Sequence, residues 1–158
     1  MSDIPAEKQS RMFEFLKNVP LFSNLSEEDL VHICGMVSRV RLEPGEELFA
    51  EGSHGNQAYV IEEGELEIVK ISGTRKVLLA LRKPGEVIGE MALLEDRPRM
   101  AGVVAGVESV VIAIEREQLQ ELMRTSPSAA EAMYYNVLER WRTTQSRVQQ
   151  SEKMAQLG

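Results

Sequence analysis

Five dipeptides that end in glycine divide the central half of the chain into short segments, and their spacing constrains the fold more than any other feature. Glycine and proline are typical of turns, because one adopts positive φ freely and the other fixes φ near −65°. The turns recur at intervals of roughly 7 to 12 residues, which suits strands but leaves no room for crossover helices. The spacing predicts an antiparallel sandwich or jelly-roll barrel and excludes a parallel α/β sheet. The dipeptides are Pro44-Gly45, Glu51-Gly52, Glu63-Gly64, Ser72-Gly73 and Pro84-Gly85.

Between these turns the residues are rich in strand-forming types. Leu66, Ile68 and Ile71 nearly alternate with charged side chains, as expected for an antiparallel strand with one face in water. The expected strands are 47–50, 57–62, 65–71, 76–82, 100–105 and 109–115.

Both ends of the chain change to a helical period. Before residue 37 we expect an amphipathic helix over 11–17 and a second helix that begins after an N-cap at Ser26. Cys34 lies on the apolar face of the second helix and is expected to be a small buried hydrophobic residue. After residue 115 we expect a helix over 118–124, then a long helix capped by Ser126 with Pro127 at its first position. The expected organisation is a helical segment over 1–37, a β core over 38–116 and C-terminal helices over 117–158.

The long C-terminal helix carries apolar residues at alternating steps of three and four. This spacing is typical of a helix seam, apolar at first and more polar later. The seam has two equally weighted interpretations: the helix packs on the barrel of its own chain, or it pairs with a second copy in a homodimer. The seam residues are Tyr134, Val137, Trp141, Thr144, Val148, Ser151 and Ala155.

Composition narrows the functional classes. The 158 residues carry 18 basic and 25 acidic side chains, for a net charge of −7, which argues against a DNA-binding module. One cysteine rules out an internal disulfide and a cysteine-rich metal site. His32 and His54 are far apart with no ligand-like cluster around either, so no metal site is expected. No stretch resembles a signal peptide or a membrane helix, so we expect a cytoplasmic protein that does not insert into a membrane.

Residues 87–101 interrupt the strand pattern and carry the chemistry. Gly89 allows the backbone to pass close to another group, and 90–94 can form one helical turn with unpaired N–H groups that suit an anion. Arg99, fixed by Pro98 before it, supplies a guanidinium for a small phosphate. Glu90 would repel an anion unless it accepts hydrogen bonds from hydroxyls of the same ligand. A sugar phosphate satisfies both demands, although Glu90 and Arg99 alone would suggest a surface salt bridge.

The same residues resemble a known motif. Gly-Glu-x-Ala-Leu-Leu from Gly89, followed by Pro-Arg-x-Ala from Pro98, is similar to the phosphate-binding cassette of cyclic nucleotide-binding domains. This family includes the regulatory subunit of cAMP-dependent protein kinase, cyclic-nucleotide-gated channels and the bacterial catabolite activator. Further stretches resemble the family's N-terminal helical motif and first barrel strands, in the right order over about 100 residues. These stretches are 18–26, 42–52 and 58–66.

The resemblance implies an eight-stranded antiparallel β-roll with N-terminal helices and a long C-terminal helix. It also implies roles for a set of cassette residues. Glu90 and the Gly89 backbone would bind the ribose 2′-hydroxyl, and Arg99 would pair with the exocyclic phosphate oxygens. Backbone amides would complete the phosphate cradle, and a small residue would let the strand approach. The amides belong to Ala92 and Met100, the small residue is Ala101, and Met91 lies within the same cassette.

The resemblance favours cAMP over cGMP as the ligand. Family members that bind cGMP often carry threonine directly after the cassette arginine, and here that position is Met100, which has no hydroxyl to donate. The stretch 140–148 resembles the central helix of the catabolite activator, in which two residues contact adenine. Thr144 and Gln145 match those positions.

We therefore expect a stand-alone cAMP receptor, without catalysis of its own, whose C-terminal helices respond to the ligand and act on an unidentified protein partner. The chain ends at Gly158, which leaves no room for the DNA-binding domain that follows in the catabolite activator. Two alternatives stay open: a cyclic nucleotide-binding fold that serves only as a protein-interaction scaffold, and the sensor fragment of a longer regulator.

Overall fold

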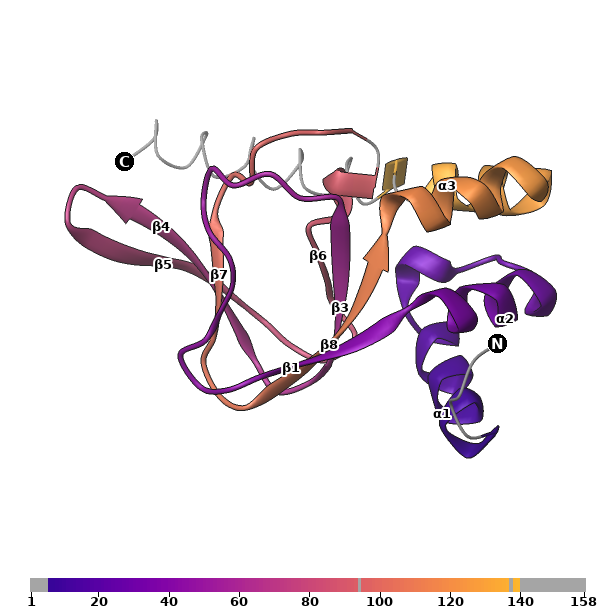
Figure 1. The fold of residues 1–158 in the computed structure, drawn as a ribbon, viewed down its shortest axis with the longest axis horizontal. Helices are drawn as coiled ribbons and strands as arrows, with labels where there is room; N and C mark the ends of the chain where they lie inside the picture. The colour runs from indigo at the N-terminus through magenta and orange to yellow at the C-terminus, as the bar shows by residue number, and fades with distance from the viewer. Residues whose placement is uncertain (1–5, 94, 137, 140–158) are drawn as a thin grey trace, which may run out of the picture.

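The computed structural model describes residues 6–93, 95–136 and 138–139 as eight antiparallel strands with helices at one end (Figure 1). The helices are α1 (Ala6–Lys17), η1 (Pro20–Phe22), α2 (Glu27–Met36), η2 (Glu90–Leu93) and α3 (Arg116–Thr125), followed by helical residues 127–136. The strands are β1 (Ser38–Leu42), β2 (Glu47–Phe49), β3 (Gln57–Glu63), β4 (Leu66–Ser72), β5 (Arg75–Arg82), β6 (Val87–Ile88), β7 (Gly102–Ala105) and β8 (Ser109–Glu115).

The strands form two four-stranded sheets. One has the order β1-β8-β3-β6 and the other β2-β7-β4-β5. Every neighbouring pair within the sheets is antiparallel, and β8 pairs with both β1 and β3. Two facing sheets of four antiparallel strands make a β-roll, and the expected fold class is confirmed.

The strands predicted over 47–50, 57–62, 65–71 and 76–82 agree with β2 to β5 within one residue at each end, and three larger differences remain. β1 and β6 were not among the predicted ranges, and β6 has only two residues, too few to show a period. The strand expected from residue 100 begins at Gly102, because the two residues before it form a bend. The helices expected over 11–17 and 118–124 are longer, Ala6–Lys17 and Arg116–Thr125.

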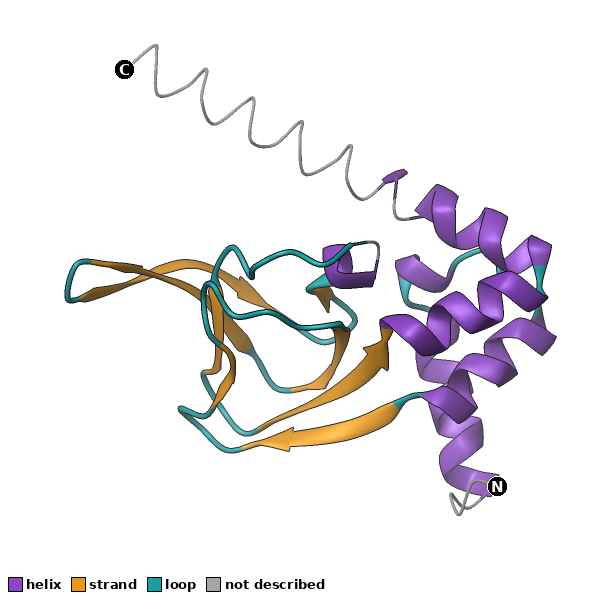
Figure 2. Cartoon of the chain, turned by 45° about the horizontal axis from the view of Figure 1, so that its top comes forward, coloured by secondary structure: helices purple, strands orange, loops and turns teal. Residues whose placement is uncertain are grey.

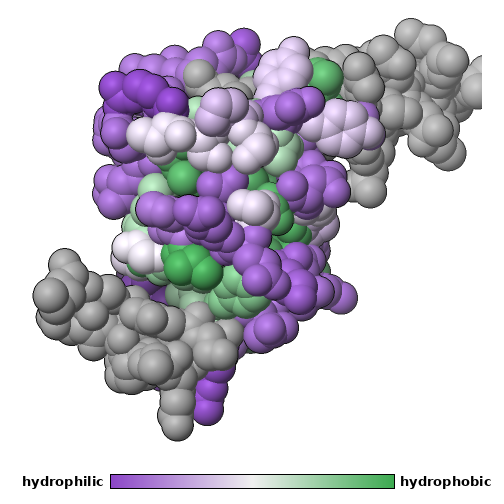
Figure 3. Space-filling model, turned by 90° about the vertical axis from the view of Figure 1, so that its right-hand side faces the viewer, coloured by the Kyte–Doolittle hydropathy of each residue, from purple (hydrophilic) through white to green (hydrophobic). Residues whose placement is uncertain are grey.

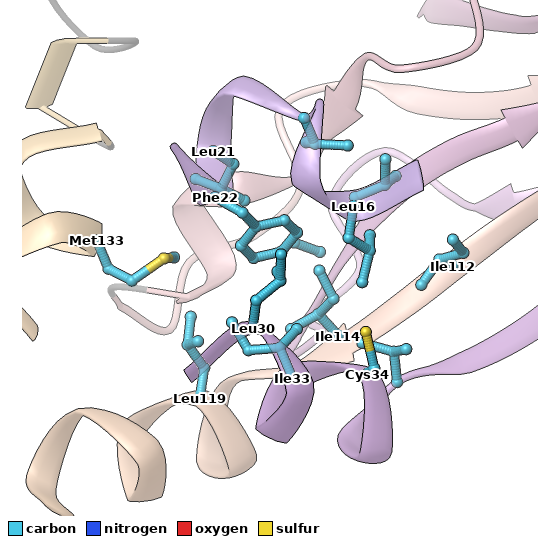
Figure 4. Packing of buried hydrophobic residues seen from close by; sticks show 14 of the residues in the cluster. Leu16, Leu21, Phe22, Leu30, Ile33, Cys34, Ile112, Ile114, Leu119 and Met133 are labelled. Atoms are coloured by element: carbon cyan, nitrogen blue, oxygen red, sulfur yellow. The ribbon is translucent and has the colours of Figure 1, made fainter. Parts of the chain in front are cut away.

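The helices pack at one end of the roll and cover a hydrophobic cluster (Figure 4). Phe22 of η1 and Leu16 of α1 are almost completely buried there, beside Ile112 and Ile114 of β8. Cys34 of α2 is buried in the same cluster, as the apolar face of its helix predicted. The outer surface of this end is mostly hydrophilic, with a small group of hydrophobic residues between the helices (Figure 3). The cluster therefore ties the helices to the sheet that contains β8.

Side chains cap two of these helices where the sequence predicted caps. The Ser26 hydroxyl accepts a hydrogen bond from the Asp29 amide at 3.1 Å, and the Ser126 hydroxyl accepts one from the Ala129 amide at 3.3 Å. Ser126 also donates to the Asp29 carboxylate at 3.0 Å. One hydrogen-bonded group thus joins the start of α2 to the start of helix 127–136.

Asn136 anchors the helical residues 127–136 to the N-terminal part of the chain. Its side-chain amide donates to the carbonyl of Leu21 at 2.9 Å and to the carbonyl of Ser23 at 2.6 Å, and the residue is buried. Tyr134, the first residue of the predicted seam, is exposed. The seam positions Val137, Trp141, Thr144, Val148, Ser151 and Ala155 lie outside the described residues, so the pairing of the long helix stays a prediction.

A second hydrophobic cluster lies between the two sheets, with Ile61, Leu66 and Val111 fully buried in it. Within the described ranges, no helix has the length and apolar character needed to cross a membrane. Nor do the described histidine, cysteine and acidic residues form a group of three that could hold a metal ion.

Candidate functional site

A tight turn at the end of β6 begins the candidate site. Gly89 has φ of +72°, a left-handed conformation that favours glycine. The 3₁₀ turn η2, Glu90–Leu93, follows directly, and the Ala92 amide donates to the Gly89 carbonyl at 3.0 Å. The single helical turn that the sequence predicted is therefore present through Leu93, while Leu94 lies outside the described residues.

Backbone hydrogen bonds hold Arg99 at the site from a different segment of the chain. Its amide donates to the carbonyl of Ser53 at 2.8 Å, and its carbonyl accepts from the amide of Gly52 at 2.7 Å. Pro98, directly before it, forms an isolated bridge with His54. These contacts attach the segment before β7 to the turn between β2 and β3, and only 8% of the Arg99 surface remains exposed.

The Arg99 guanidinium is buried with few hydrogen bonds to the protein. Its Nη2 donates to the carbonyl of Gln57 at 2.8 Å, and its central carbon lies 4.1 Å from the centre of the Phe49 ring, within the range of a cation–π interaction. Its Nε is buried without a hydrogen-bond partner in the structure. Desolvation lowers the pKa of Arg99, an effect partly opposed by Tyr59, but an arginine remains protonated at any ordinary pH. The site therefore contains a fixed positive charge with unused hydrogen-bonding capacity.

Two glycines provide the space that the guanidinium occupies. A Cβ built on Gly55 would lie 2.6 Å from Nη2 of Arg99, and a Cβ on Gly89 would lie 2.6 Å from Nη1. Any other residue at either position would displace the guanidinium. Gly55 and Gly89 thus set the position of Arg99 from two separate segments.

A cavity of about 680 Å³ opens beside Arg99, within the size range of small-molecule sites. It lies between η2, the segment before β7 and the inner side of the second sheet, where Phe49 and Ile68 line it. The structure brings seven of the nine predicted site residues to this one cavity: Gly89, Glu90, Met91, Ala92, Arg99, Met100 and Ala101. Thr144 and Gln145 lie outside the described residues.

The predicted residues differ in how they face the cavity. Glu90 is half-buried, Ala92 is buried, and Met100 is 77% exposed. The carbonyl of Ala92 accepts a hydrogen bond from Nη1 of Arg116 at 3.2 Å. Because Arg116 is the first residue of α3, this bond connects the turn of the site directly to a helix at the helical end.

Sequence reasoning missed three residues that position Arg99: Phe49, Gly55 and Gln57. They lie more than 40 positions from Arg99, and Gln57 contributes its backbone carbonyl, which any residue could provide. The second glycine of the stretch Gly52-Ser53-His54-Gly55 was the one available signal, because two glycines so close indicate more than a turn. Even this signal does not say which side chain needs the space.

The geometry fits an anion that also carries hydroxyl groups. A buried guanidinium offers hydrogen bonds and charge to a phosphate, and the half-buried carboxylate of Glu90 lines the same cavity. Apolar groups such as Ile68 and Val103 line the remaining wall and suit a flat organic group.

Comparison with known proteins gives the family. The model of the cyclic nucleotide-binding domain matches residues 39–126, more than half of the chain, and the chain belongs to this family. The cAMP-dependent protein kinase regulatory subunit of Yarrowia lipolytica is 33% identical over 117 residues, which cover 74% of this chain and 31% of the relative. The chain therefore spans about a third of the length of the curated relatives it matches.

Solved structures agree with the fold. The N-terminal domain of a transcriptional regulator from Streptomyces coelicolor A3(2) has a TM-score of 0.73 and 33% identity, and the match covers 82% of this chain and 91% of that one. The catabolite activator protein of Thermus thermophilus has a TM-score of 0.70 and 28% identity, over 84% of this chain and 63% of that one. Both are similar to this chain over the roll and its flanking helices.

Proposed function

We propose that this chain is a cAMP receptor without catalysis of its own, which transmits ligand binding to a protein partner. The observation that carries the proposal is Arg99: a buried guanidinium on the wall of a cavity, with an Nε that has no partner in the structure. A buried charge is costly unless it is paired. A bound phosphate would supply the missing charge and acceptors.

The proposed binding mode uses groups from two segments of the chain that line the cavity. Arg99 pairs with the exocyclic oxygens of the cyclic phosphate, while Glu90 and the Gly89 backbone bind the ribose 2′-hydroxyl. The amides of Ala92 and Met100 add donors to the phosphate. Because the Ala92 amide already donates to the Gly89 carbonyl at 3.0 Å, phosphate binding has to share or replace that bond. The η2 turn is therefore the part of the site that responds to the ligand.

Two considerations support cAMP over cGMP. Met100, directly after Arg99, has no hydroxyl to donate to guanine, and its side chain is largely exposed. The Yarrowia lipolytica relative is named as a cAMP-dependent regulatory subunit. We place adenine beside Thr144 and Gln145, and these two contacts stay a prediction from the sequence. The affinity for cGMP is the comparison to be measured.

The proposed output runs through the helical end. Nη1 of Arg116 holds the Ala92 carbonyl at 3.2 Å, so a shift of η2 reaches the first residue of α3 directly. From α3 the displacement passes to the C-terminal helices, whose position the partner reads. The partner is a separate protein, a second copy paired through the C-terminal helix, or a further domain if the chain is the sensor part of a longer regulator.

Isothermal titration of Arg99→Ala with cAMP tests the proposal. Removing the cationic partner of a buried phosphate is expected to cost about 2–5 kcal/mol of binding free energy, which is about 30-fold or more in Kd. Arg41→Ala is the matched control, because it removes the same charge from an exposed residue that does not line the cavity. The proposal fails if Arg99→Ala binds cAMP as tightly as the wild type. A folded wild type that gives no heat with cAMP or cGMP would instead favour the interaction scaffold.

A further inference from the structure

Strand β5, Arg75–Arg82, has one side with which no described strand pairs. In the sheet order β2-β7-β4-β5 it pairs with β4 alone among the described strands. The β4–β5 hairpin projects beyond the rest of the two sheets, at the end opposite the helices (Figures 1 and 2). An edge of this kind presents backbone N–H and C=O groups to another chain.

The hairpin exposes an unusual concentration of apolar side chains. Ile71 of β4 and Val77, Leu78, Leu79 and Leu81 of β5 are each between 42% and 62% exposed. Successive residues of a strand point to opposite faces, so this apolar run lies on both sides of the hairpin. Isolated exposed leucines are ordinary, but a contiguous group marks an interaction surface.

A register shift lies in the middle of this group. Val69 pairs with Leu78 and Ile68 pairs with Ala80, which leaves Leu79 as an extra residue on β5. A bulge at an edge bends the strand and increases its twist. The bulge therefore interrupts the free edge at Leu79 and leaves a short stretch on each side of it.

The outer part of the hairpin is opposite in charge to the whole chain, although β4 also contains Glu67 and Glu86 lies 3.9 Å from Arg82. Residues 70–83 contain five basic side chains and no acidic one, while the chain carries −7 overall. The basic residues lie on both sides of the apolar run: Lys70, Arg75, Lys76, Arg82 and Lys83.

This charge argues against the two occupants that the chain itself could supply. Antiparallel pairing of two β5 strands about Leu79 would place Lys76 opposite Arg82 of the second copy, and like charges opposite each other are destabilising. The C-terminal stretch 140–158 has four basic residues and one acidic residue, so it also carries the same sign as the hairpin. The complementary occupant has to be acidic.

We propose that β5 binds an extended acidic segment of a partner protein, which adds to this sheet as the next strand. Backbone hydrogen bonds along the free edge and apolar contacts with Val77 and Leu81 would hold the segment. Acidic residues at both of its ends would pair with the basic residues on either side of the apolar run. Of the apolar and basic residues named for this surface, Arg82 alone also lines the cavity at Arg99, and the proposal does not depend on the proposed ligand.

An anionic membrane is the other macromolecular surface that could attract basic and apolar groups. A hairpin that enters a membrane needs apolar residues at its tip, and here the tip is Ser72-Gly73-Thr74-Arg75-Lys76. The apolar residues lie along the strand, where an added strand would contact them. The placement of these residues favours the peptide.

The direct test is fluorescence anisotropy of the full-length chain with a synthetic probe. The probe is a labelled nine-residue peptide with five valines in its centre, which present apolar side chains to both faces of the sheet, and two glutamates at each end. We expect saturable binding that weakens with salt, because screening removes part of the attraction. The same peptide with lysines at its ends is expected not to bind.

Variants assign the binding to β5. Val77→Thr with Leu81→Thr places β-branched residues at both positions, which suit a strand, and is expected to weaken binding of the probe by about tenfold. Lys76→Gln with Lys83→Gln is expected to weaken it by a similar factor. Val31→Thr, an exposed residue on α2, is the control and should bind like the wild type. Amide exchange of the wild type should slow in β5 when the probe is present.

Four outcomes would overturn the proposal. The first is equal binding of the lysine-ended peptide, and the second is unchanged binding of the probe by the Val77 and Leu81 variant. The third is binding to vesicles of phosphatidylcholine and phosphatidylserine but not to the probe. The fourth is a wild-type dimer that the same variant converts to a monomer in sedimentation. A fall of more than about 5 °C in the melting temperature of that variant would also count against it, since it would indicate that the patch is packed within the chain.

Discussion

The helical end of the β-roll and the region around its cavity differ in how they use buried space. At the helical end, β8 contributes Ile112 and Ile114 to a cluster in which Leu16 and Phe22 are almost completely buried. At the cavity end, the roll surrounds a hollow of about 680 Å³ and buries the charge of Arg99 beside it. One end stabilises the fold by filling space, and the other leaves space and an incompletely bonded cation. The difference teaches that stability and binding depend on largely different residues here, with Val87 belonging to both the cluster and the cavity lining, so most substitutions can change one without the other.

The helical end is expected to be the more sensitive to a loss of volume. Phe22→Ala should lower the free energy of unfolding by about 3–5 kcal/mol, because it leaves a void among fully buried neighbours. Phe49→Ala removes the same atoms from a half-buried position next to a hollow, so it should cost less stability but weaken cAMP binding through Arg99. Urea unfolding and titration calorimetry of both variants measure the two effects. A larger stability loss for Phe49→Ala would reverse the comparison.

Three glycine substitutions sharpen the comparison at the cavity end. Gly85→Ala introduces only left-handed strain, since φ is +91° and no atom lies within 4 Å of the new Cβ; we expect a loss of about 1–2 kcal/mol. Gly55→Ala displaces Arg99 without positive φ, and Gly89→Ala does both. Of the three variants, Gly89→Ala should therefore show the largest fall in the free energy of unfolding.

Titration with cAMP separates the two causes in the same set. Gly55→Ala and Gly89→Ala should both bind cAMP more weakly, whereas Gly85→Ala should bind like the wild type. Equal affinities across the three would mean that the glycines do not set the position of Arg99.

Arg99→Met tests whether the buried charge is retained for stability. In the ligand-free protein we expect the free energy of unfolding to stay within about 1 kcal/mol of the wild type or to rise, because the substitution removes a desolvated cation and keeps the volume. Thermal unfolding without ligand checks this expectation, and the added stability that saturating cAMP gives the wild type should disappear. A loss of several kcal/mol without ligand would show that the cation stabilises the empty site.

The smallest expected effect concerns Cys34 at the helical end. Burial raises the pKa of its thiol, so the folded chain keeps the thiol proton to a higher pH than the unfolded chain. Stability linked to this group is complete below the ordinary thiol pKa and falls as pH rises through the folded value. Iodoacetamide should therefore modify the native protein slowly at pH 8 and rapidly in urea. Fast modification of the native protein would show that this cluster opens readily.

Local sequence patterns predicted most of the fold, because turns, caps and strand periods depend on neighbouring residues. The turn glycines and the Ser26 cap are examples. The two-residue strand β6 is too short to show a strand period. The predicted strands do not include β1, which begins directly after the predicted helical segment ends at residue 37. The helix predicted over 11–17 begins five residues earlier in the structure, because residues 6–10 are polar or small and show no helical spacing of apolar residues.

The candidate site was predictable where it follows one stretch of sequence. Gly89, Glu90 and Arg99 come from a single segment of 15 residues, and all of them line the cavity. Phe49 and Gly55 act on Arg99 only through the pairing of distant strands, which one sequence does not reveal. The adenine contacts expected at Thr144 and Gln145 stay predictions.

The side-chain amide of Asn136 joins the helical residues 127–136 to η1 and the residue after it. One NH₂ group donates hydrogen bonds to the carbonyls of Leu21 and Ser23. An outward displacement of Asn136 would therefore leave both carbonyls without this donor at the same time. Both hydrogen bonds are kept if η1 moves together with these helical residues. A displacement of the helical residues 127–136 is therefore expected to carry η1 with it, because this one side chain joins the two segments.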